Sequence, residues 1–269
     1  MSQQSETSFE NVTLTVTDRI GTVTLNRPDK LNSFAGRMRQ EVADAVRVLA
    51  DREDIRVLII TGAGRAFCAG ADISYMKDLL EAGDTESFTS LVEAGRHVVT
   101  TIRNTPKPVI AMVNGPAAGG GANLALACDI RIAADNASIG QTFNRIGLHP
   151  DWGGTYFLPR LVGTSKSLEL MFSAEMVSAD EALRLGIFNR VVLAHKLVEE
   201  TMTFARMLAA KPPKALALTK EAVYASEGST LEQMLDTELH HQLRCFVSED
   251  AHEGLHAFLE KRQPHFRGA

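Results

Sequence analysis

Cysteine, aromatic residues and basic charge are all scarce in this chain. Three of its 269 residues are cysteine, 6% are aromatic, and the formal net charge is −5. Cys68, Cys128 and Cys245 are widely spaced and form no C-x-x-C pair, which argues against a disulfide framework and a thiolate zinc site. We expect them to be core thiols. Acidic residues outnumber basic ones, so nucleic acid is not an expected partner.

Long apolar runs and a leader-type N-terminus are also missing. Residues 1–9 are polar, without a basic region followed by an apolar stretch, and no uncharged run is long enough for a membrane span. These features predict a cytoplasmic protein without a membrane partner. The composition, 45% hydrophobic and 23% charged, is typical of a globular protein, and a chain of this length can bury a full core.

The hydrophobic pattern predicts alternating strands and helices. Apolar residues alternate with polar ones on both sides of a turn within 12–25, which predicts a hairpin. A helical period follows over 33–51, with Arg and Glu on the face opposite the apolar one. The short apolar runs 57–60 and 109–113 are typical of strands covered on both faces, and each ends in a glycine turn. The pattern therefore predicts an α/β fold.

The last third of the chain is predicted to be mostly helical. Pro212 and Pro213 interrupt it, and beyond them leucines recur every four residues, at Leu231, Leu235, Leu239 and Leu243. A leucine face of this kind packs either on a neighbouring subunit or on its own domain. The sequence leaves both interpretations open.

Two glycine-rich turns carry the chemical interest. Segment 62–73 reads GAGRAFCAGADI and segment 114–123 reads NGPAAGGGAN. Glycine lets a backbone approach a ligand closely, and a helix that begins at such a turn presents free N–H groups to negative charge. Neither turn fits a phosphate loop, and Phe67 and Leu124 stand where a dinucleotide turn needs its last glycine. The two turns could hold one oxyanion between them.

Segment 57–73, with FCAGADI at its core, closely resembles the first signature of the enoyl-CoA hydratase/isomerase (crotonase) family. Segment 108–130, with its three glycines and a Cys-Asp pair, resembles the second, and LNRP, LN, GGT and AFLEKR extend the similarity over nearly the whole chain. The resemblance implies an α/β fold with a ββα spiral core over 1–200 and a C-terminal helical trimerisation region over 201–269. It also implies an acyl-CoA thioester substrate, no cofactor besides the coenzyme A of that substrate, and a homotrimer or a dimer of trimers.

The resemblance also assigns the two turns one joint role. Carried over residue by residue, the backbone N–H groups of Ala71 and Gly120 form an oxyanion hole for the thioester carbonyl. One such donor is typically worth about 3 kcal/mol in the transition state. The resemblance and the motifs together give these expected substrate-binding residues: Ala69, Ala71, Asp72, Ile73, Gly120, Phe143, Trp152, Phe258 and Lys261.

Several of these residues have a second interpretation that the sequence leaves open. Asp72 is more readily explained as a structural residue that hydrogen-bonds the turn beside Ala71. Trp152 either lines the acyl site or packs beside it. Phe258 and Lys261 are candidates for a contact with coenzyme A, in the same or a neighbouring subunit, and the alternative for Lys261 is a solvated lysine.

The carboxylates expected of a hydratase are missing from the matching positions. Alignment with the family places Asn123 at the first acid and Phe143 at the second, and neither residue shuttles a proton at neutral pH. Efficient hydration is therefore disfavoured. Asp151, in the segment HPDWGGT, resembles the lone acid of isomerising members, including the ring isomerases of phenylacetate degradation. Burial would raise its pKa above the ordinary value of about 3.9 and make it a better base.

Other interpretations of Asp151 and of the chain remain. Asp151 could cap the following helix, or act as the nucleophile of aryl-CoA chemistry. The chain could be a hydratase in the broad family sense or an acyl-CoA-binding protein without activity. His149 is either a helper in proton transfer or a surface residue. A zinc site at the H-E-x-x-H pattern of 252–256 is disfavoured, because little chain follows it to supply a third ligand, and no metal is expected.

Overall fold

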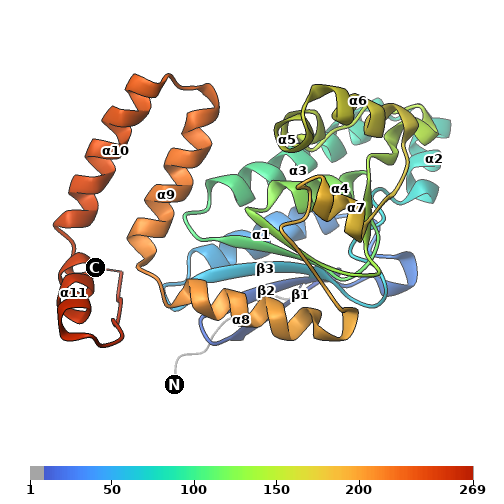
Figure 1. Cartoon of the computed structure of the whole chain (residues 1–269). Coiled ribbons are helices and arrows are strands. Elements are labelled where there is room, and N and C mark those ends of the chain that lie inside the picture. Colours follow the sequence, from blue (N-terminus) through green and yellow to red (C-terminus); the bar gives the residue numbers. More distant parts are fainter. Residues whose placement is uncertain (1–8, 269) are drawn as a thin grey trace.

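A six-stranded sheet lies at the centre of the molecule, which is described over residues 9–268 by a computed structural model (Figure 1). Its strand order is β1-β2-β3-β4-β6-β9, and only the β1–β2 hairpin is antiparallel. The strands are β1 (Val12–Thr17), β2 (Ile20–Leu25), β3 (Val57–Gly62), β4 (Val109–Val113), β6 (Ile130–Ala134) and β9 (Arg190–Val192). β3 and β4 are buried along their whole length, as expected of central parallel strands with both faces covered.

A second, smaller sheet holds the loops of the candidate site. It has the strand order β5-β7-β8, formed by β5 (Ala117–Ala118), β7 (Ser138–Gly140) and β8 (Val177–Ser178). The predicted hairpin, the two buried strands and the α/β class are confirmed. The thiols of Cys68 and Cys128 are buried as predicted, and burial raises the pKa of each to about 12, whereas Cys245 is only half-buried.

Helices cover the sheets and frame the site. They are α1 (Met38–Ala50), α2 (Ile73–Ala82), α3 (Thr85–Asn104), α4 (Gly120–Ala127), α5 (Gly154–Val162), α6 (Thr164–Ser173), α7 (Ala179–Arg184) and α8 (Leu197–Ala209). α1 packs on α3 and on β1 and β2, while α8 packs against β2, β3, β4 and β6. The helix predicted from residue 33 begins only at Met38. Phe34 instead pairs with Ala71 in an isolated parallel bridge, and Gly36 has a left-handed φ of 49°.

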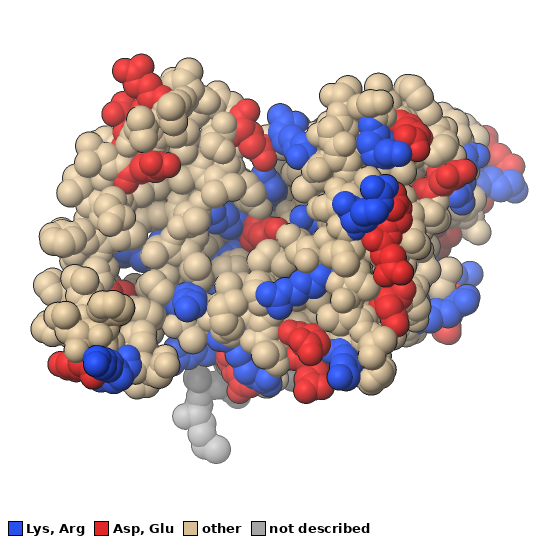
Figure 2. All heavy atoms as spheres, viewed as in Figure 1, with Lys and Arg blue, Asp and Glu red and all other residues tan. Residues whose placement is uncertain are grey.

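Three further helices stand to one side of the sheet (Figure 1): α9 (Pro213–Ala225), α10 (Leu231–Phe246) and α11 (Glu249–Glu260). The four leucines of α10 are between 54% and 77% exposed, so packing on their own domain does not cover them. The visible surface of this region is mostly uncharged (Figure 2). The expected boundary between 1–200 and 201–269 falls inside α8, and the helices that stand apart begin at Pro213.

The H-E-x-x-H pattern lies on α11 but its glutamate is engaged elsewhere. Glu253 accepts hydrogen bonds from Arg262 Nη1 at 2.6 Å and from the His265 N–H at 2.7 Å. Between residues 9 and 268, no group of three His, Cys, Asp or Glu side chains is arranged to hold a metal ion. Over the same span, no helix is both long and apolar enough to cross a membrane. The polar segment 1–8, noted above for its lack of a leader pattern, lies outside the described residues.

Candidate active site

The two glycine-rich turns lie directly against each other. The Ala118 N–H donates to the Cys68 carbonyl at 2.9 Å, next to a parallel bridge between Cys68 and Ala117. A Cβ atom on Gly121 would lie 2.1 Å from the Cys68 oxygen. Gly70 has a φ of 89°, and a Cβ atom there would lie 3.4 Å from the Gly120 nitrogen. The glycines are therefore what allows the turns to approach.

Replacing Gly121 by Ala is expected to destabilise the protein by about 1–3 kcal/mol, because the new methyl group forces the Cys68 carbonyl out of place. The measurement is the free energy of unfolding in urea. Gly228→Ala is the control, since a Cβ atom at Gly228 meets nothing within 4 Å. Equal stability of the two variants would contradict this account of the turn.

The side chain of Asn32 holds the first glycine-rich turn, residues 62–73, through hydrogen bonds to its carbonyl groups. Its Nδ2 lies 2.9 Å from the Ala63 carbonyl oxygen and 2.8 Å from that of Ala66, and the residue is fully buried. Its Oδ1 accepts the Arg27 N–H at 2.9 Å. The LN pair was noted as part of the family resemblance, but no role was predicted for it. Its role is to shape the turn that carries Ala71.

The N–H groups of Ala71 and Gly120 are free donors. Within the described chain, neither takes part in a backbone hydrogen bond outside the helices and strands, and Gly120, as the first residue of α4, has no acceptor in its own helix. Gly119 precedes it with a φ of 52°, a left-handed conformation that favours glycine. The α4 dipole adds positive potential at the Gly120 N–H. Both donors open on the same cavity.

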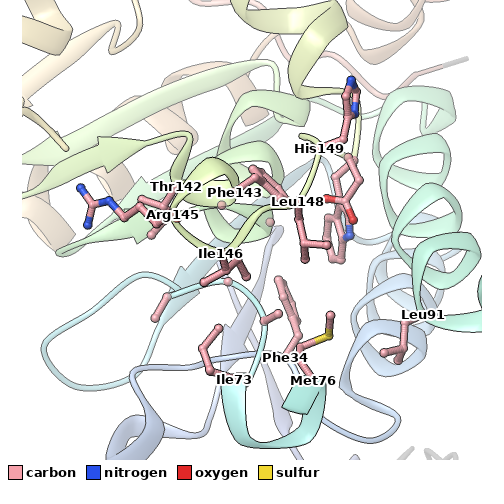
Figure 3. A pocket seen from close by; sticks show the side chains of 18 of the residues that line it. Phe34, Ile73, Met76, Leu91, Thr142, Phe143, Arg145, Ile146, Leu148 and His149 are labelled. Carbon is pink, nitrogen blue, oxygen red and sulfur yellow. The ribbon is translucent and has the colours of Figure 1, made fainter. Parts of the chain in front are cut away.

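The cavity has a volume of about 760 Å³ and is lined mainly by apolar side chains (Figure 3). Phe34, Ile73, Met76 and Leu148 are among those that line it. Most of the predicted site residues lie on its wall, namely Ala69, Ala71, Ile73, Gly120, Phe143, Asp151 and Trp152.

Three predicted substrate-binding residues lie elsewhere in this chain. Asp72 caps α2, where its Oδ1 accepts the Ser74 N–H at 3.2 Å, and its Oδ2 pairs with Arg27 at 3.2 Å. These contacts agree with the interpretation of Asp72 as a structural residue of the turn beside Ala71. Phe258 is 82% exposed on α11, and Lys261 ends that helix with a left-handed φ of 54°. Neither lines the cavity.

Asn123 holds the main chain of Asp151, and no side chain of the described residues donates a hydrogen bond to the Asp151 carboxylate. Asn123 Nδ2 donates to the Asp151 carbonyl at 2.8 Å, while Asn123 Oδ1 accepts from Gln141 Nε2 at 2.7 Å. The carboxylate atom Oδ1 of Asp151 is buried without a hydrogen-bond partner. Burial raises the pKa of Asp151 to about 6, against the opposing effects of the Arg39 and His149 charges. The exposed His149 lines the same cavity (Figure 3).

The backbone is strained at the residue that follows Asp151. Trp152 has a φ of 50°, which a bulky residue rarely adopts, and it is only 6% exposed. Its ring stacks on Phe34 with the ring centroids 4.7 Å apart. Gly95 on α3 makes room, since a Cβ atom there would lie 2.0 Å from Trp152 Nε1. Such strain persists where packing holds it, and it is concentrated at functional sites.

Phe34 and Arg39 are among the cavity-wall residues that the sequence did not predict. Phe34 precedes α1 and pairs with the first turn, its N–H donating to the Gly70 carbonyl at 2.7 Å. The helical pattern placed arginines on the outer face of α1, which is wrong for Arg39, because Arg39 is only 5% exposed. The apolar stripe of α1 identifies the face that packs on the core. It gives no sign that a second face of the helix, which carries Arg39, lines the cavity.

Comparisons with known proteins agree with this geometry. A profile of the family described as enoyl-CoA hydratase/isomerase matches residues 15–269. The chain is 38% identical over 260 residues to a crotonyl-CoA hydratase of Syntrophomonas wolfei, covering 96% of this chain and 98% of the relative. It is 40% identical over 248 residues to a 1,2-epoxyphenylacetyl-CoA isomerase of Escherichia coli, covering 92% and 94%.

Solved structures with the same fold are found among enoyl-CoA hydratases. An enoyl-CoA hydratase from Bacillus anthracis shares a TM-score of 0.91 at 36% identity, with 97% of this chain and all of that chain (100%) covered. A protein of Streptomyces coelicolor A3(2), described as a putative enoyl-CoA hydratase, shares a TM-score of 0.92 at 33% identity, with 100% of both chains covered. The chain therefore belongs to the enoyl-CoA hydratase/isomerase family and is an acyl-CoA-processing enzyme.

Proposed function

We propose that the protein shifts the double bond of an enoyl-CoA thioester, with Asp151 as its single acid and base. The observation that carries the proposal is the unpartnered, buried carboxylate oxygen of Asp151, which shares one cavity with the two free N–H donors. A carboxylate with a pKa of about 6 is ionised at neutral pH and is a stronger base than an ordinary aspartate.

The mechanism follows from this placement. The thioester carbonyl accepts hydrogen bonds from Ala71 and Gly120, and these stabilise the charge that develops on its oxygen. Asp151 removes the α-proton of a 3-enoyl thioester, which leaves a dienolate. The same carboxyl group then returns the proton to the γ-carbon, and the double bond moves into conjugation with the carbonyl. One carboxylate suffices because it is regenerated at the end.

The residues around the cavity disfavour hydration. Two carboxylates are expected to hold and activate the water of a hydratase, whereas Asp151 is the one carboxylate among the described residues that line the cavity. Phe143, at the position of the second acid, contributes an aromatic ring (Figure 3). Asn123, at the position of the first, is fully buried, and its amide is engaged with Asp151 and Gln141.

The experiment that tests this proposal is an NMR assay in D₂O with 2-enoyl-CoA and 3-enoyl-CoA thioesters. Migration of the double bond, with deuterium entering at the α- or γ-carbon, is the expected result. Rapid formation of 3-hydroxyacyl-CoA would overturn it in favour of hydration. Tight binding without any exchange would instead support the acyl-CoA-binding protein without activity.

A ring-bearing acyl group is a second candidate substrate. The stacked Phe34 and Trp152 give the cavity an aromatic wall, on which a planar ring packs well. The Escherichia coli relative is named a 1,2-epoxyphenylacetyl-CoA isomerase. Adding aryl-acetyl thioesters to the same NMR panel distinguishes this candidate from straight-chain isomerisation. A covalent aryl or acyl ester on Asp151, detected by mass spectrometry, would show that Asp151 acts as a nucleophile and not as a base.

The pH dependence of the rate reports on Asp151. We expect kcat/KM to rise with pH and to level off above a midpoint near pH 6, because only the ionised carboxylate accepts the α-proton. The Arg39 charge lowers the pKa of Asp151, so Arg39→Met is expected to move the midpoint to higher pH. A flat profile between pH 5 and 8 would contradict Asp151 as the base.

The exposed leucines support the expected assembly into a homotrimer or a dimer of trimers. Replacing both Leu235 and Leu239 by Glu is expected to shift the protein toward monomers, because charge on a buried subunit contact is costly. Sedimentation equilibrium measures the mass. Val198→Glu, at a residue of α8 that is 61% exposed, is the control. An unchanged mass in the double variant would show that α10 makes no subunit contact.

A further inference from the structure

A buried arginine without hydrogen-bond partners lines the acyl-CoA cavity. Arg39, the second residue of α1, is 5% exposed and belongs to the cavity wall. Its Nε and Nη1 atoms are buried and have no hydrogen-bond partner. In the proposed isomerisation Arg39 lowers the pKa of Asp151 through its charge, and none of its N–H groups takes part in a step.

No described carboxylate lies within ion-pairing distance of this guanidinium. Across the described residues, Arg39 takes part in no ion pair within 4.0 Å. Asp151 interacts with it electrostatically but not through a hydrogen bond. The guanidinium carbon lies 5.4 Å from the centroid of the Phe34 ring, a contact that stabilises a cation without satisfying its N–H groups. A buried charge in this state is costly unless a ligand completes it.

The other arginine of the cavity is satisfied. Arg145 is exposed, and its Nε donates to the Ala174 carbonyl at 2.8 Å. It therefore has access to water and a fixed acceptor, whereas Nε and Nη1 of Arg39 are buried and have no acceptor. The contrast indicates that Arg39 is kept for something that enters the cavity.

We propose that Arg39 is a specificity-determining residue that binds an oxygen acceptor of the acyl group other than the thioester oxygen. This inference rests on the proposed acyl-CoA site. A guanidinium presents its donors as a planar fork, which a carboxylate fits best and a ketone oxygen fits less well. The favoured substrates are thus acyl thioesters that carry a second carboxylate or another oxygen function, and not plain hydrocarbon chains.

Binding of saturated thioesters tests this inference separately from turnover. Adipoyl-CoA, 5-oxohexanoyl-CoA and hexanoyl-CoA have the same chain length and cannot isomerise, so calorimetry of the full-length protein reports on recognition alone. Succinyl-CoA and butyryl-CoA repeat the comparison at four carbons. We expect an oxygenated thioester to bind about tenfold or more tightly than its hydrocarbon counterpart, since hydrogen bonds to charged groups are the strong ones. Comparison of 5-oxohexanoyl-CoA with adipoyl-CoA shows whether Arg39 prefers a ketone oxygen or a carboxylate.

Variants assign the preference to the side chain. Arg39→Met should abolish it while the protein stays folded, because the substitution breaks no hydrogen bond of Nε or Nη1. Arg39→Lys keeps a charge and should retain part of the preference. Arg145→Met is the matched control and should leave the affinity ratio unchanged. Equal affinities in the wild type, or a preference that survives in Arg39→Met, would overturn the inference, and neither result depends on whether the enzyme isomerises.

Discussion

Replacing Asp151 by Asn is expected to lower kcat for double-bond migration by about 10²- to 10⁴-fold, the usual contribution of a positioned general base. The amide has the shape of the carboxyl group but cannot accept the α-proton. Deuterium exchange at the α- and γ-carbons should be lost together, because one group serves both positions. NMR in D₂O under single-turnover conditions measures both quantities.

The Asp151→Asn variant should remain folded and bind substrate. Burial raises the pKa of Asp151 from an ordinary 3.8 to about 6. Between these values the folded state holds a proton that the unfolded state releases, so wild-type stability falls as pH rises from 4 to 6. The variant lacks this decline and should be at least as stable at pH 7. Loss of rate accompanied by unfolding, or exchange at the wild-type rate, would contradict the assigned role.

Replacing Gly120 by Pro is expected to lower kcat by about 10²- to 10³-fold, the cost of one oxyanion-hole donor. Proline removes the N–H group and places a ring carbon where the hydrogen pointed. The first position of a helix tolerates proline, and Gly120 is the first residue of α4. Steady-state kinetics with a 3-enoyl thioester measures the effect.

Gly120→Ala is the matched control for the proline variant. The three heavy atoms nearest to a Cβ atom at Gly120 are ring atoms of Phe34 and Trp152, 3.7–3.8 Å away, and the N–H donor remains. Its loss of rate should be far smaller than that of the proline variant. Similar losses in both variants would mean that space at Gly120, and not its donor, matters to the reaction.

Local patterns were sufficient for much of the fold. The hairpin at 12–25 and the buried strands at 57–60 and 109–113 are confirmed, because alternation and continuous apolar runs report directly on how many faces are covered. The start of α1 was wrong by several residues. Phe34 leaves the helix to pair with Ala71, which is more than thirty residues away and invisible to a local pattern.

The candidate site was predictable where a motif names a backbone position and less so elsewhere. The two glycine turns and Asp151 do lie around one cavity. Arg39 and Phe34 were missed because their burial depends on how α1 meets loops from other parts of the chain. Asn123 was recognised only as a missing acid, although its amide holds the main chain of Asp151.

The amide of Asn123 also limits how this protein could evolve. A Cβ atom on Gly154 would lie 2.5 Å from its Nδ2, so the space around it is closed. Placing at this position the glutamate of the family's hydratases would lengthen the side chain toward α5 and set a carboxylate oxygen against the Asp151 carbonyl, where an N–H now donates. A glutamate at position 123 would therefore cost stability, and it would bring no hydration until a second carboxylate was present as well. Under the proposed function, a gain of hydration therefore does not follow readily from single substitutions.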